Sequence, residues 1–505
     1  MHIAIVGAGY AGLATASTLI AFGHSVIIFE SSPDVGGVWS KTNHYPGLKS
    51  QNDKGSYCFS TLSMPKSYPT HPTGEQIQAY LESYVKAQGL DKEGRLRLNT
   101  KVVKAEKKNN GWILHVSTDS QPEESLSFDY LICSTGIFNQ PNIPSFNGAN
   151  EFTSSGGTIV HTSNFHKLFA IEDKNVIVVG FGKSACDTAV AASSTAKSVT
   201  LAARDVIWKL PTYVGGTVHY GYLLLTRFGE ALFPYIRPWR SQTFLNHGLG
   251  RPIRAAIIST VSAVISTQLK LNKFGLYPDK PFDTIARSSV SLASQGFVTA
   301  VDSGRLKVER GLTIDSLSSN KATLSNGKEI EADVIVCGTG WTNHVPSFLP
   351  TEYTTKLLNK DGDWVLYRHT LPIDIPDLAF VGFNSSIFCP LTAEMTSIWL
   401  AASLENDISR PLVRIPPQQA QRKLAEEEVA WHRKRTDGHY ANGTSIVPFS
   451  MSNIDEMLED LGSKIGWFSY MREWLLPVSP LAYRNILPSV LKRRDTLRVQ
   501  QKKVA

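Results

Sequence analysis

Two short glycine-rich segments have the residue types and spacing that most clearly predict chemistry in this chain. They are GAGYAG, residues 7–12, and GFGKSA, residues 180–185. The first follows the apolar run HIAIV and the second follows NVIVV, and each leads into a stretch of small residues. A glycine-rich turn between a strand and a helix directs backbone N–H groups and the helix N-terminus at a pyrophosphate. Two such turns favour an enzyme that passes electrons between two dinucleotides.

The first turn has glycine at each of its three critical positions. Gly7 permits the tight turn, Gly9 removes the side chain that would block the pyrophosphate, and Gly12 lets the helix approach the strand. Glu30 ends the next apolar run, SVIIFE, where a carboxylate can accept hydrogen bonds from ribose hydroxyls. An acid at a strand end is also common without any ligand. With the turn in place, we interpret Glu30 as a ribose ligand.

The second turn predicts a different nucleotide. Its companion strand, SVTLAAR, ends in Arg204 in place of an acid. A guanidinium pairs bidentately with a 2′-phosphate, which a carboxylate would repel. We therefore expect NADPH rather than NADH, with Lys209 as a further candidate ligand; the alternative is an ordinary surface arginine. The turn residues expected to line this site are Gly180, Gly182, Lys183, Ser184 and Ala185, the last in the third glycine position.

Composition argues against several other classes of protein. The net charge of +7 over 505 residues is small, and no basic stripe with interleaved aromatics indicates nucleic-acid binding. The cysteines are widely spread and form no CxxC pair, which argues against a metal site or a redox dithiol and favours a reduced compartment. They are Cys58, Cys133, Cys186, Cys337 and Cys389.

No segment has the pattern of a membrane span or a signal peptide. None reaches the roughly 20 apolar residues that crossing a bilayer requires. The longest candidate, residues 255–269, is interrupted by serine and threonine, and we interpret it as a buried helix. The chain enters a strand at once, without a basic region before an apolar core. These features predict a cytoplasmic protein, and peripheral membrane contact through the aromatic and basic residues 467–494 stays open.

Further motifs are spread over most of the chain. They are E-x5-GG-x-W at residues 30–39, YPGLKSQN at 45–52, YPTHPTGEQ at 68–76, STG at 134–136, GFGKSACD at 180–187 and CGTGW at 337–341. Together with the first turn they resemble the flavin-containing monooxygenases, the class that also includes Baeyer–Villiger and N-hydroxylating enzymes. The YPGL and YPTHPTGE segments are most similar to fungal members.

The resemblance implies the cofactors and the reaction. FAD would bind at the first turn and NADPH at the second, and reduced FAD would react with O2 to form a C4a-hydroperoxide that oxygenates a small organic substrate. The cofactor supplies this chemistry, while the protein supplies geometry and a dry pocket. One alternative is a pyridine-nucleotide reductase that does not oxygenate, although it would need a dithiol beside the flavin. Another is a flavin-bearing scaffold, which would need no NADPH site.

The resemblance also implies site residues. Gln51 and Asn52 lie where the family places an amide near the flavin, and either is a candidate catalytic residue; loop capping is the alternative. His161 is a third catalytic candidate, for which an orienting role at a domain junction is favoured over proton transfer. The other implied contacts to FAD or NADPH are Gly37, Val38, Trp39, Gln51, Val103, Thr135, Gly136 and Thr339. No metal is expected.

The family fingerprint F-x-G-x-x-x-H-x-x-x-[FYW] is met in part. Gly157, His161 and Phe165 have the required spacing, but Ser155 stands at the phenylalanine position. His166 follows Phe165, where a Baeyer–Villiger enzyme would have tryptophan followed by proline or aspartate. This difference favours oxygenation at nitrogen or sulfur, with secondary metabolism as one setting. Baeyer–Villiger oxidation of a ketone is the alternative.

The predicted fold is α/β, with two Rossmann-like dinucleotide-binding domains and the NADPH domain inserted into the FAD domain. Strand–Thr–Gly segments ending at Gly136 and Gly340 are the expected crossings. The tail is expected to be solvated, and a homodimer is left open. The predicted divisions are 1–150 for the first FAD part, 151–340 for the NADPH domain with a helical insertion at 206–282, 341–470 for the second FAD part and 471–505 for a C-terminal extension.

Overall fold

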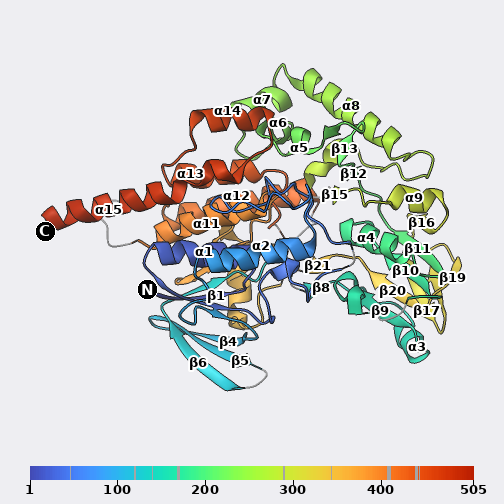
Figure 1. Ribbon diagram of the computed structural model, residues 1–505, viewed down its shortest axis with the longest axis horizontal. Coiled ribbons are helices and arrows are strands. Elements are labelled where there is room, and N and C mark those ends of the chain that lie inside the picture. Colours follow the sequence, from blue (N-terminus) through green and yellow to red (C-terminus); the bar gives the residue numbers. More distant parts are fainter. Residues whose placement is uncertain are drawn as a thin grey trace.

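The computed structural model describes residues 1–504 except 46, 119–120, 139, 168–170, 288–290, 343, 406–410, 438–441 and 443. Two parallel sheets form the frame, one in the left half of the view and one in the right half (Figure 1). Helices cover both sheets, and α8 and α14 lie along the upper edge.

The first sheet is built from the outer parts of the chain. Its strand order is β24-β7-β1-β2-β3, and every neighbouring pair is parallel. Strand β1 leads through the first glycine turn into α1 (Tyr10–Ala21), which packs on α11 (Cys389–Ser403). Both faces of β1 are covered, so its apolar run shows no alternation. The strands are β1 (His2–Val6), β2 (Ser25–Phe29), β3 (Leu96–Arg97), β7 (Tyr130–Cys133) and β24 (Leu378–Phe380).

The second sheet repeats this plan. Its order is β16-β11-β10-β20-β9, again with parallel neighbours only, and β10 leads through the second turn into α4 (Lys183–Ala192). Its strands are β9 (Thr158–His161), β10 (Asn175–Val179), β11 (Ser198–Ala203), β16 (Leu306–Arg310) and β20 (Val334–Cys337). The two sheets confirm the predicted α/β fold with two Rossmann-like units.

The chain crosses between the sheets twice, and the two crossings pair with each other. Strand β8 (Gln140–Pro141) follows β7, and β21 (Trp341–Thr342) follows β20; these short strands are antiparallel neighbours. The chain then returns to the first sheet as β24, beside β7. Insertion of one nucleotide domain into another would produce this path. The residue limits of the domains remain a prediction.

Smaller sheets and helices complete the frame. Helix α2 (Gly74–Ala87) begins with a capping box formed by Thr73 and Gln76. The three-stranded sheets are β4 (Lys101–Lys108), β5 (Gly111–Thr118) and β6 (Gln121–Phe128), and β17 (Ile314–Ser318), β18 (Lys321–Leu324) and β19 (Glu329–Glu331). Other elements are α3 (Ala149–Ser154), α9 (Phe297–Asp302), β22 (Leu366–Tyr367), β23 (Leu371–Pro372), α10 (Thr354–Leu357) and α12 (Gln418–Thr436).

The segment expected to be a helical insertion also contains strands. Its elements are β12 (Lys209–Leu210), β13 (Tyr213–Val214), β14 (Val218–His219), α5 (Gly221–Leu224), α6 (Arg227–Ala231), α7 (Arg240–His247) and α8 (Arg251–Gln268), and β12 pairs with β15 (Ser291–Leu292). The prediction of a buried helix at 255–269 is wrong. In α8 only Ile265 and Ser266 are buried, because the helix packs on its neighbours near its ends and most of its length faces outward.

The C-terminal segment, expected to be solvated, is helical, and among its described side chains from Lys492 to Gln501 only Arg494 is buried. It forms α13 (Ser450–Asp460), α14 (Trp467–Leu475) and α15 (Ile486–Val504). Two of its arginines donate to backbone carbonyls: Arg494 Nη1 to Phe22 O, at the end of α1, at 2.9 Å, and Arg493 Nη2 to Leu412 O at 2.7 Å. Among the described residues, no single helix has the length and apolarity to cross a membrane; only α7 and α8 together, bent by 79°, meet that test.

Candidate active site

The first glycine turn forms a cradle walled by backbone. Gly7 has a φ of +108°, and a Cβ there would lie 2.5 Å from Ser134 O. A Cβ on Gly12 would overlap the backbone oxygen of Gly7. The helix can therefore approach the strand only because residue 12 is glycine. Gly9 takes the N-cap position of α1 and offers no side chain, and no acid lies in the described first turn. These N–H groups are therefore left for an anion such as a pyrophosphate.

Glu30 is held at the end of β2 by the backbone. Its Oε2 accepts from Ala8 N–H at 2.9 Å and its Oε1 from Ser32 N–H at 2.8 Å. The residue is 9% exposed and lies next to the turn. A carboxylate has lone pairs beyond these two bonds, so a fixed Glu30 can still accept from ribose hydroxyls.

The E-x5-GG-x-W segment closes over the same turn. A Cβ on Gly37 would lie 3.3 Å from Gly9 Cα, so the two glycine backbones lie in close contact. Val38 is exposed, while Trp39 is buried and donates from Nε1 to Tyr57 Oη at 3.2 Å. Trp39, two residues after Gly37, is thus held in place by Tyr57.

The end of β7 presents unpaired hydroxyls beside the cradle. Ser134 Oγ and Thr135 Oγ1 are buried and have no hydrogen-bond partner among the described residues. A buried hydroxyl without a partner is unfavourable, so a polar ligand is expected there. Gly136 follows them directly. Val103 lies at a bulge in β4, between the paired residues Val102 and Lys104, and is partly exposed.

The residues around the first turn therefore fit FAD. The cradle, the fixed carboxylate and the orphaned hydroxyls surround one space at the carboxyl edge of a parallel sheet, which is where dinucleotides bind in such folds.

The second turn has the same backbone shape with a different third residue. Gly180 has a φ of +112°, and a Cβ there would lie 2.5 Å from Gly338 O. Ala185 fits because its neighbour is Gly338, where any Cβ would overlap the alanine methyl. Gly182, at the N-cap of α4, has no protein atom within 4 Å of a Cβ position. The space that a pyrophosphate needs is present.

Helix α4 is tied to the FAD half of the chain. Lys183 Nζ donates to Asp187 Oδ1 at 2.6 Å, and Tyr45 Oη donates to Asp187 Oδ2 at 3.3 Å. Burial and the carboxylate of Asp187 raise the pKa of Tyr45, so its phenol remains a donor. Ser184 follows Lys183 in the first turn of α4, where its N–H belongs to the open helix N-terminus.

Arg204 and Lys209 have opposite surroundings. The Arg204 side chain is 75% exposed and pairs with exposed Asp205 at 3.1 Å, a contact that a phosphate can replace. Lys209 is buried under the turn, where its Nζ donates to Phe181 O at 2.6 Å and to Ser291 Oγ at 2.8 Å. Lys209 therefore supports the turn and does not face a 2′-phosphate, which corrects the suggestion made from the sequence.

Residues 50–53, which we call the amide loop, bring both candidate amides to the domain junction. Gln51 is exposed, and its Oε1 accepts from Leu292 N–H of β15 at 3.0 Å. Asn52 is buried, and its Nδ2 donates at 3.0 Å to Ile387 O, just before α11. Asn52 fixes the loop to the first sheet's helix layer, while the NH2 group of Gln51 remains available.

His161 lies at the junction of β9 with the returning crossing. Its Nδ1 accepts from Ser163 N–H at 3.3 Å, so Nε2 carries the proton and donates to Gly340 O at 3.0 Å. Burial lowers the pKa of His161, which keeps the ring neutral. Thr339 also holds this crossing, because its Oγ1 donates to Asn142 O.

Phe152 lies beside the fingerprint segment, in which Ser155 stands at the phenylalanine position. Phe152 is fully buried, and its ring would lie 2.5 Å from a Cβ on Gly157. Phe165 is buried nearby in the chain, while the His166 side chain is outside the described residues. Phe152 therefore packs against Gly157 of the fingerprint.

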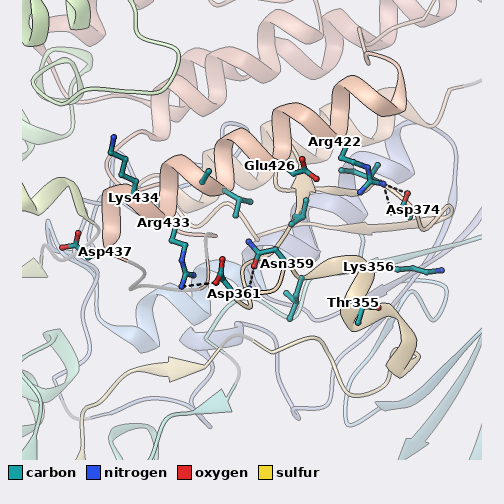
Figure 2. Close-up of a pocket in the computed structure, with 15 residues that line it drawn as sticks. Thr355, Lys356, Asn359, Asp361, Asp374, Arg422, Glu426, Arg433, Lys434 and Asp437 are labelled. Atoms are coloured by element: carbon teal, nitrogen blue, oxygen red, sulfur yellow. Dashed lines mark hydrogen bonds and ion pairs between the residues drawn. The ribbon is translucent and has the colours of Figure 1, made fainter.

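A cavity of about 790 Å³ lies between α10 and α12, away from both turns (Figure 2). Its two arginines are paired: Arg422 contacts Asp374 at 2.6 Å, and Arg433 contacts Asp361 at 3.9 Å. None of its lining residues belongs to either glycine turn or to the amide loop. We therefore do not place the substrate there.

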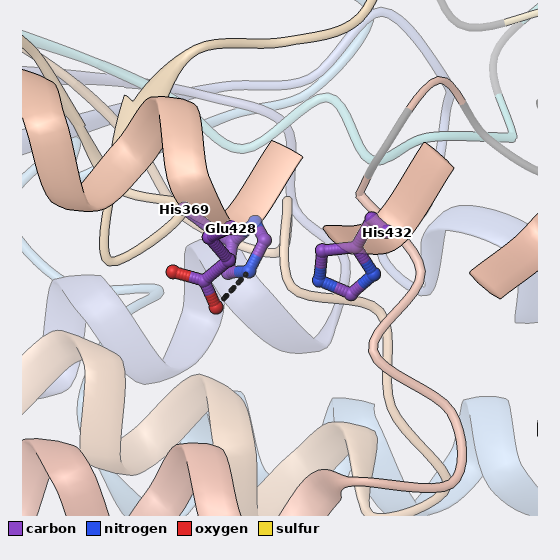
Figure 3. Close-up of side chains that lie close together, drawn as sticks. All are labelled: His369, Glu428 and His432. Carbon is purple, nitrogen blue, oxygen red and sulfur yellow. Dashed lines mark hydrogen bonds and ion pairs between the residues drawn. The ribbon is translucent and has the colours of Figure 1, made fainter. Parts of the chain in front are cut away.

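A buried His–Glu–His cluster has metal-ligand residue types but the wrong protonation (Figure 3). His369 Nε2 contacts Glu428 Oε1 at 3.2 Å, and His432 lies beside them. Arg435 Nη2 donates to His432 Nδ1 at 2.9 Å, so His432 Nε2 must carry the proton and cannot bind a metal. Metal-bound histidines instead donate their second N–H outward. With Arg237 also 3.4 Å from Glu428, the cluster is a buried ion-pair network.

Sequence reasoning missed several residues that shape the site. Tyr45 was seen only within a motif, and no role was assigned to Ser134, His71 or His219. Tyr220 received no role either, although its hydroxyl donates to Gln51 O. Each of these residues contacts a partner more than 80 residues away in sequence or contacts a backbone atom. The spacing of residues within a motif does not predict such contacts.

The comparisons with known proteins agree with this geometry. A model of the flavin-binding monooxygenase-like family matches residues 1–472, so the chain belongs to this family. A probable flavin-containing monooxygenase 1 of Arabidopsis thaliana is 26% identical over 504 residues, which cover 91% of this chain and 92% of the relative.

Two solved structures show the same fold at low identity. The S-allyl-L-cysteine S-oxygenase from Allium sativum is 18% identical with a TM-score of 0.61, covering 100% of this chain and 98% of that one. Cyclohexanone monooxygenase with bound ε-caprolactone is 16% identical with a TM-score of 0.66, covering 91% and 98%. Family membership and the two nucleotide cradles make the chain an FAD- and NADPH-dependent monooxygenase.

Proposed function

We propose that the enzyme transfers one oxygen atom from O2 to a nitrogen or sulfur atom of a small organic substrate. The observation that carries this choice is the sequence Phe165–His166, where a Baeyer–Villiger enzyme would have tryptophan followed by proline or aspartate. Phe165 is buried and supports the junction by packing, with no polar group to offer a ketone.

The cofactors would be held by the residues around the two turns. Gly7, Gly9, Glu30 and Thr135 would hold FAD, and the second turn with Arg204 would hold NADPH. When bound, NADPH supplies a hydride and FAD supplies the redox chemistry that activates O2. The chain's own residues bind, orient and exclude water.

Gln51 is the amide that we assign to the reacting side of the site. It is exposed at the junction, its carbonyl oxygen is fixed by Leu292 N–H, and its NH2 group can donate without losing a proton. Asn52 is buried and holds the loop in place. His161 is neutral with both ring nitrogens engaged, so we assign it a positioning role at the crossing.

Product analysis tests this proposal against its closest alternative. The purified holoenzyme is given NADPH and 18O2 with a thioether, a tertiary amine or a cyclic ketone. We expect 18O in a sulfoxide or N-oxide. Lactone formation from the ketone as the main product would overturn the choice in favour of Baeyer–Villiger oxidation. NADPH consumption that leaves every substrate unlabelled would instead favour a reductase.

We also propose peripheral binding to anionic membranes through one edge of the molecule. Helices α14, α6, α7 and α8 follow one another along this edge, and Trp239 contacts Trp474 at 6.1 Å between ring centroids (Figure 1). The exposed apolar side chains, which we call the apolar edge, are Phe244 (48%), Leu249 (90%), Ile253 (54%), Trp467 (66%), Phe468 (84%) and Leu475 (77%).

The charges around the apolar edge favour an anionic surface over a second copy of the chain. No Asp or Glu occurs between Glu230 and Asp279, while Arg240 and Arg251 there are exposed. Around α14 the acid Glu473 is buried against Arg227. Exposed tryptophan and phenylalanine with flanking arginines are typical of interfacial helices, and each basic residue adds attraction to acidic lipids.

Vesicle sedimentation tests the apolar edge. We expect the protein to bind phosphatidylserine vesicles in a salt-sensitive way and to ignore pure phosphatidylcholine vesicles. Replacing Trp467 and Phe468 with serine should abolish binding, whereas Ile143→Ser, at an exposed site elsewhere, should not. Failure to sediment with either vesicle would refute the proposal. So would a dimer in light scattering that the double variant dissociates.

A further inference from the structure

A chain of hydrogen bonds runs from the insertion to the amide loop. Gly221 N–H donates to His219 Nδ1 at 3.1 Å. His219 Nε2 lies 3.2 Å from His71 Nε2, and His71 Nδ1 lies 3.2 Å from Ser50 O. His71 comes from the turn before α2 and His219 from β14, so the two rings join parts of the chain that are far apart in sequence.

The Gly221 N–H group determines which nitrogen of each histidine carries the proton. Because a backbone N–H occupies His219 Nδ1, the proton of that ring is on Nε2 and points at His71 Nε2. His71 Nε2 must then accept, so its own proton is on Nδ1 and is donated to Ser50 O. All three hydrogen bonds form together only when both imidazole rings are neutral.

The same loop is held by a second contact from the insertion. Tyr220 Oη donates to Gln51 O, and the Tyr220 ring lies 4.8 Å from His219. Burial raises the pKa of Tyr220, so it stays a donor. Asp53 is the charged group that acts on both histidines, and Tyr213 is the other titratable side chain that touches His219.

We propose that His71 and His219 are positioning residues that hold the amide loop against the insertion while both rings are neutral, and that protonation of His71 releases it. This inference rests on the proposed function, because Gln51 acts only when the loop is in place. A protonated His71 would point an N–H at the N–H of His219, and two donors cannot form the bond.

The direction of the pH effect follows from the surroundings of the pair. Burial lowers the pKa of both histidines, and His219 lowers that of His71 further. The neutral pair therefore persists through neutral pH, and the link is lost as the pH falls below the ordinary histidine range of about 6.5. We expect kcat to fall on this acidic side and the KM for NADPH to stay constant.

Two variants of His219 separate the hydrogen bond from the ring. His219→Phe keeps the contact with Tyr220 and removes the donor, and we expect kcat to fall about tenfold, as for one lost hydrogen bond. His219→Gln keeps an N–H donor that does not titrate, so it should restore most of kcat and weaken the acidic decline. His247→Gln, an exposed histidine of α7, is the matched control.

Hydrogen exchange of the amide loop gives a readout that does not depend on turnover. In the FAD-loaded protein, we expect peptides covering residues 49–54 to exchange faster in His219→Phe at pH 8, and in the wild type only at acidic pH, after correction for intrinsic rates. Unchanged exchange and kcat in His219→Phe would overturn the inference. If the wild type shows no oxygenation but the loop responds as expected, the proposed function fails and the pairing stands.

Discussion

The first glycine turn lies beside a buried carboxylate, whereas the second lies beside an exposed guanidinium. Glu30 is 9% exposed and held by two backbone N–H groups, while the Arg204 side chain is 75% exposed and pairs with its neighbour Asp205. The backbones of the two turns are otherwise alike, with Gly7 and Gly180 at nearly the same φ. The difference suits a resident cofactor at the first turn and an exchanging cosubstrate at the second.

Matched valine substitutions should produce the largest effects and separate the two turns. In Gly9→Val the Cβ itself has room, 3.7 Å from Gly37 Cα, but the added methyls would crowd the helix N-terminus where the pyrophosphate is expected. We expect the purified variant to lose almost all FAD, measured by absorbance after denaturation. Gly182→Val faces open space, so it should keep its FAD and raise the KM for NADPH. A fully yellow Gly9→Val protein would contradict the assignment.

Arg204→Ala should sharpen the contrast at the second turn. Loss of one charge-assisted pair with the 2′-phosphate is expected to raise the KM for NADPH about tenfold or more. The KM for NADH, which lacks that phosphate, should change little. Lys209→Met would be a poor substitute for this test, because Lys209 supports the turn from below. Equal effects on both nucleotides would remove Arg204 from the site.

A smaller effect is expected on the pH dependence of stability, through Glu394 in α11. Burial raises the pKa of Glu394 in α11 to about 8, although Ser60 donates to both of its oxygens. A raised folded pKa means that stability is fully present below the unfolded value and is lost as the pH rises through 8. The cost is about 1.4 kcal/mol per pH unit across that window.

Glu394→Gln keeps the shape and removes the titration. We expect its unfolding temperature to equal or fall below that of the wild type at pH 5 and to exceed it at pH 9, by differential scanning fluorimetry. Parallel curves for the two proteins from pH 5 to pH 9 would show that Glu394 does not control this dependence.

The parts of the site that depend on local sequence could be predicted. Glycine spacing, the apolar strand before it and the charged residue after the next strand all lie within one βαβ unit, and the structure has both units where they were expected. Ala185 was accepted as a small residue, but its partner Gly338 lies over 150 residues away, so the reason for its size could not be seen.

The parts that depend on distant contacts could not be predicted. His71 meets His219 only because the insertion folds over the amide loop. Helix α8 was expected to be buried from its apolar content, yet content does not say what packs on it. Most described side chains of the tail are exposed or half-buried, as its charge led us to expect, but Arg494 is buried and donates to the carbonyl of Phe22 at the end of α1.

Anaerobic mixing of the purified protein with NADPH tests the central claim most directly. The account predicts that the protein carries about one FAD per chain, that NADPH bleaches this flavin rapidly, and that NADH does so far more slowly. A protein that binds no FAD, or whose flavin stays oxidised in the presence of NADPH, would contradict the assignment of the two turns.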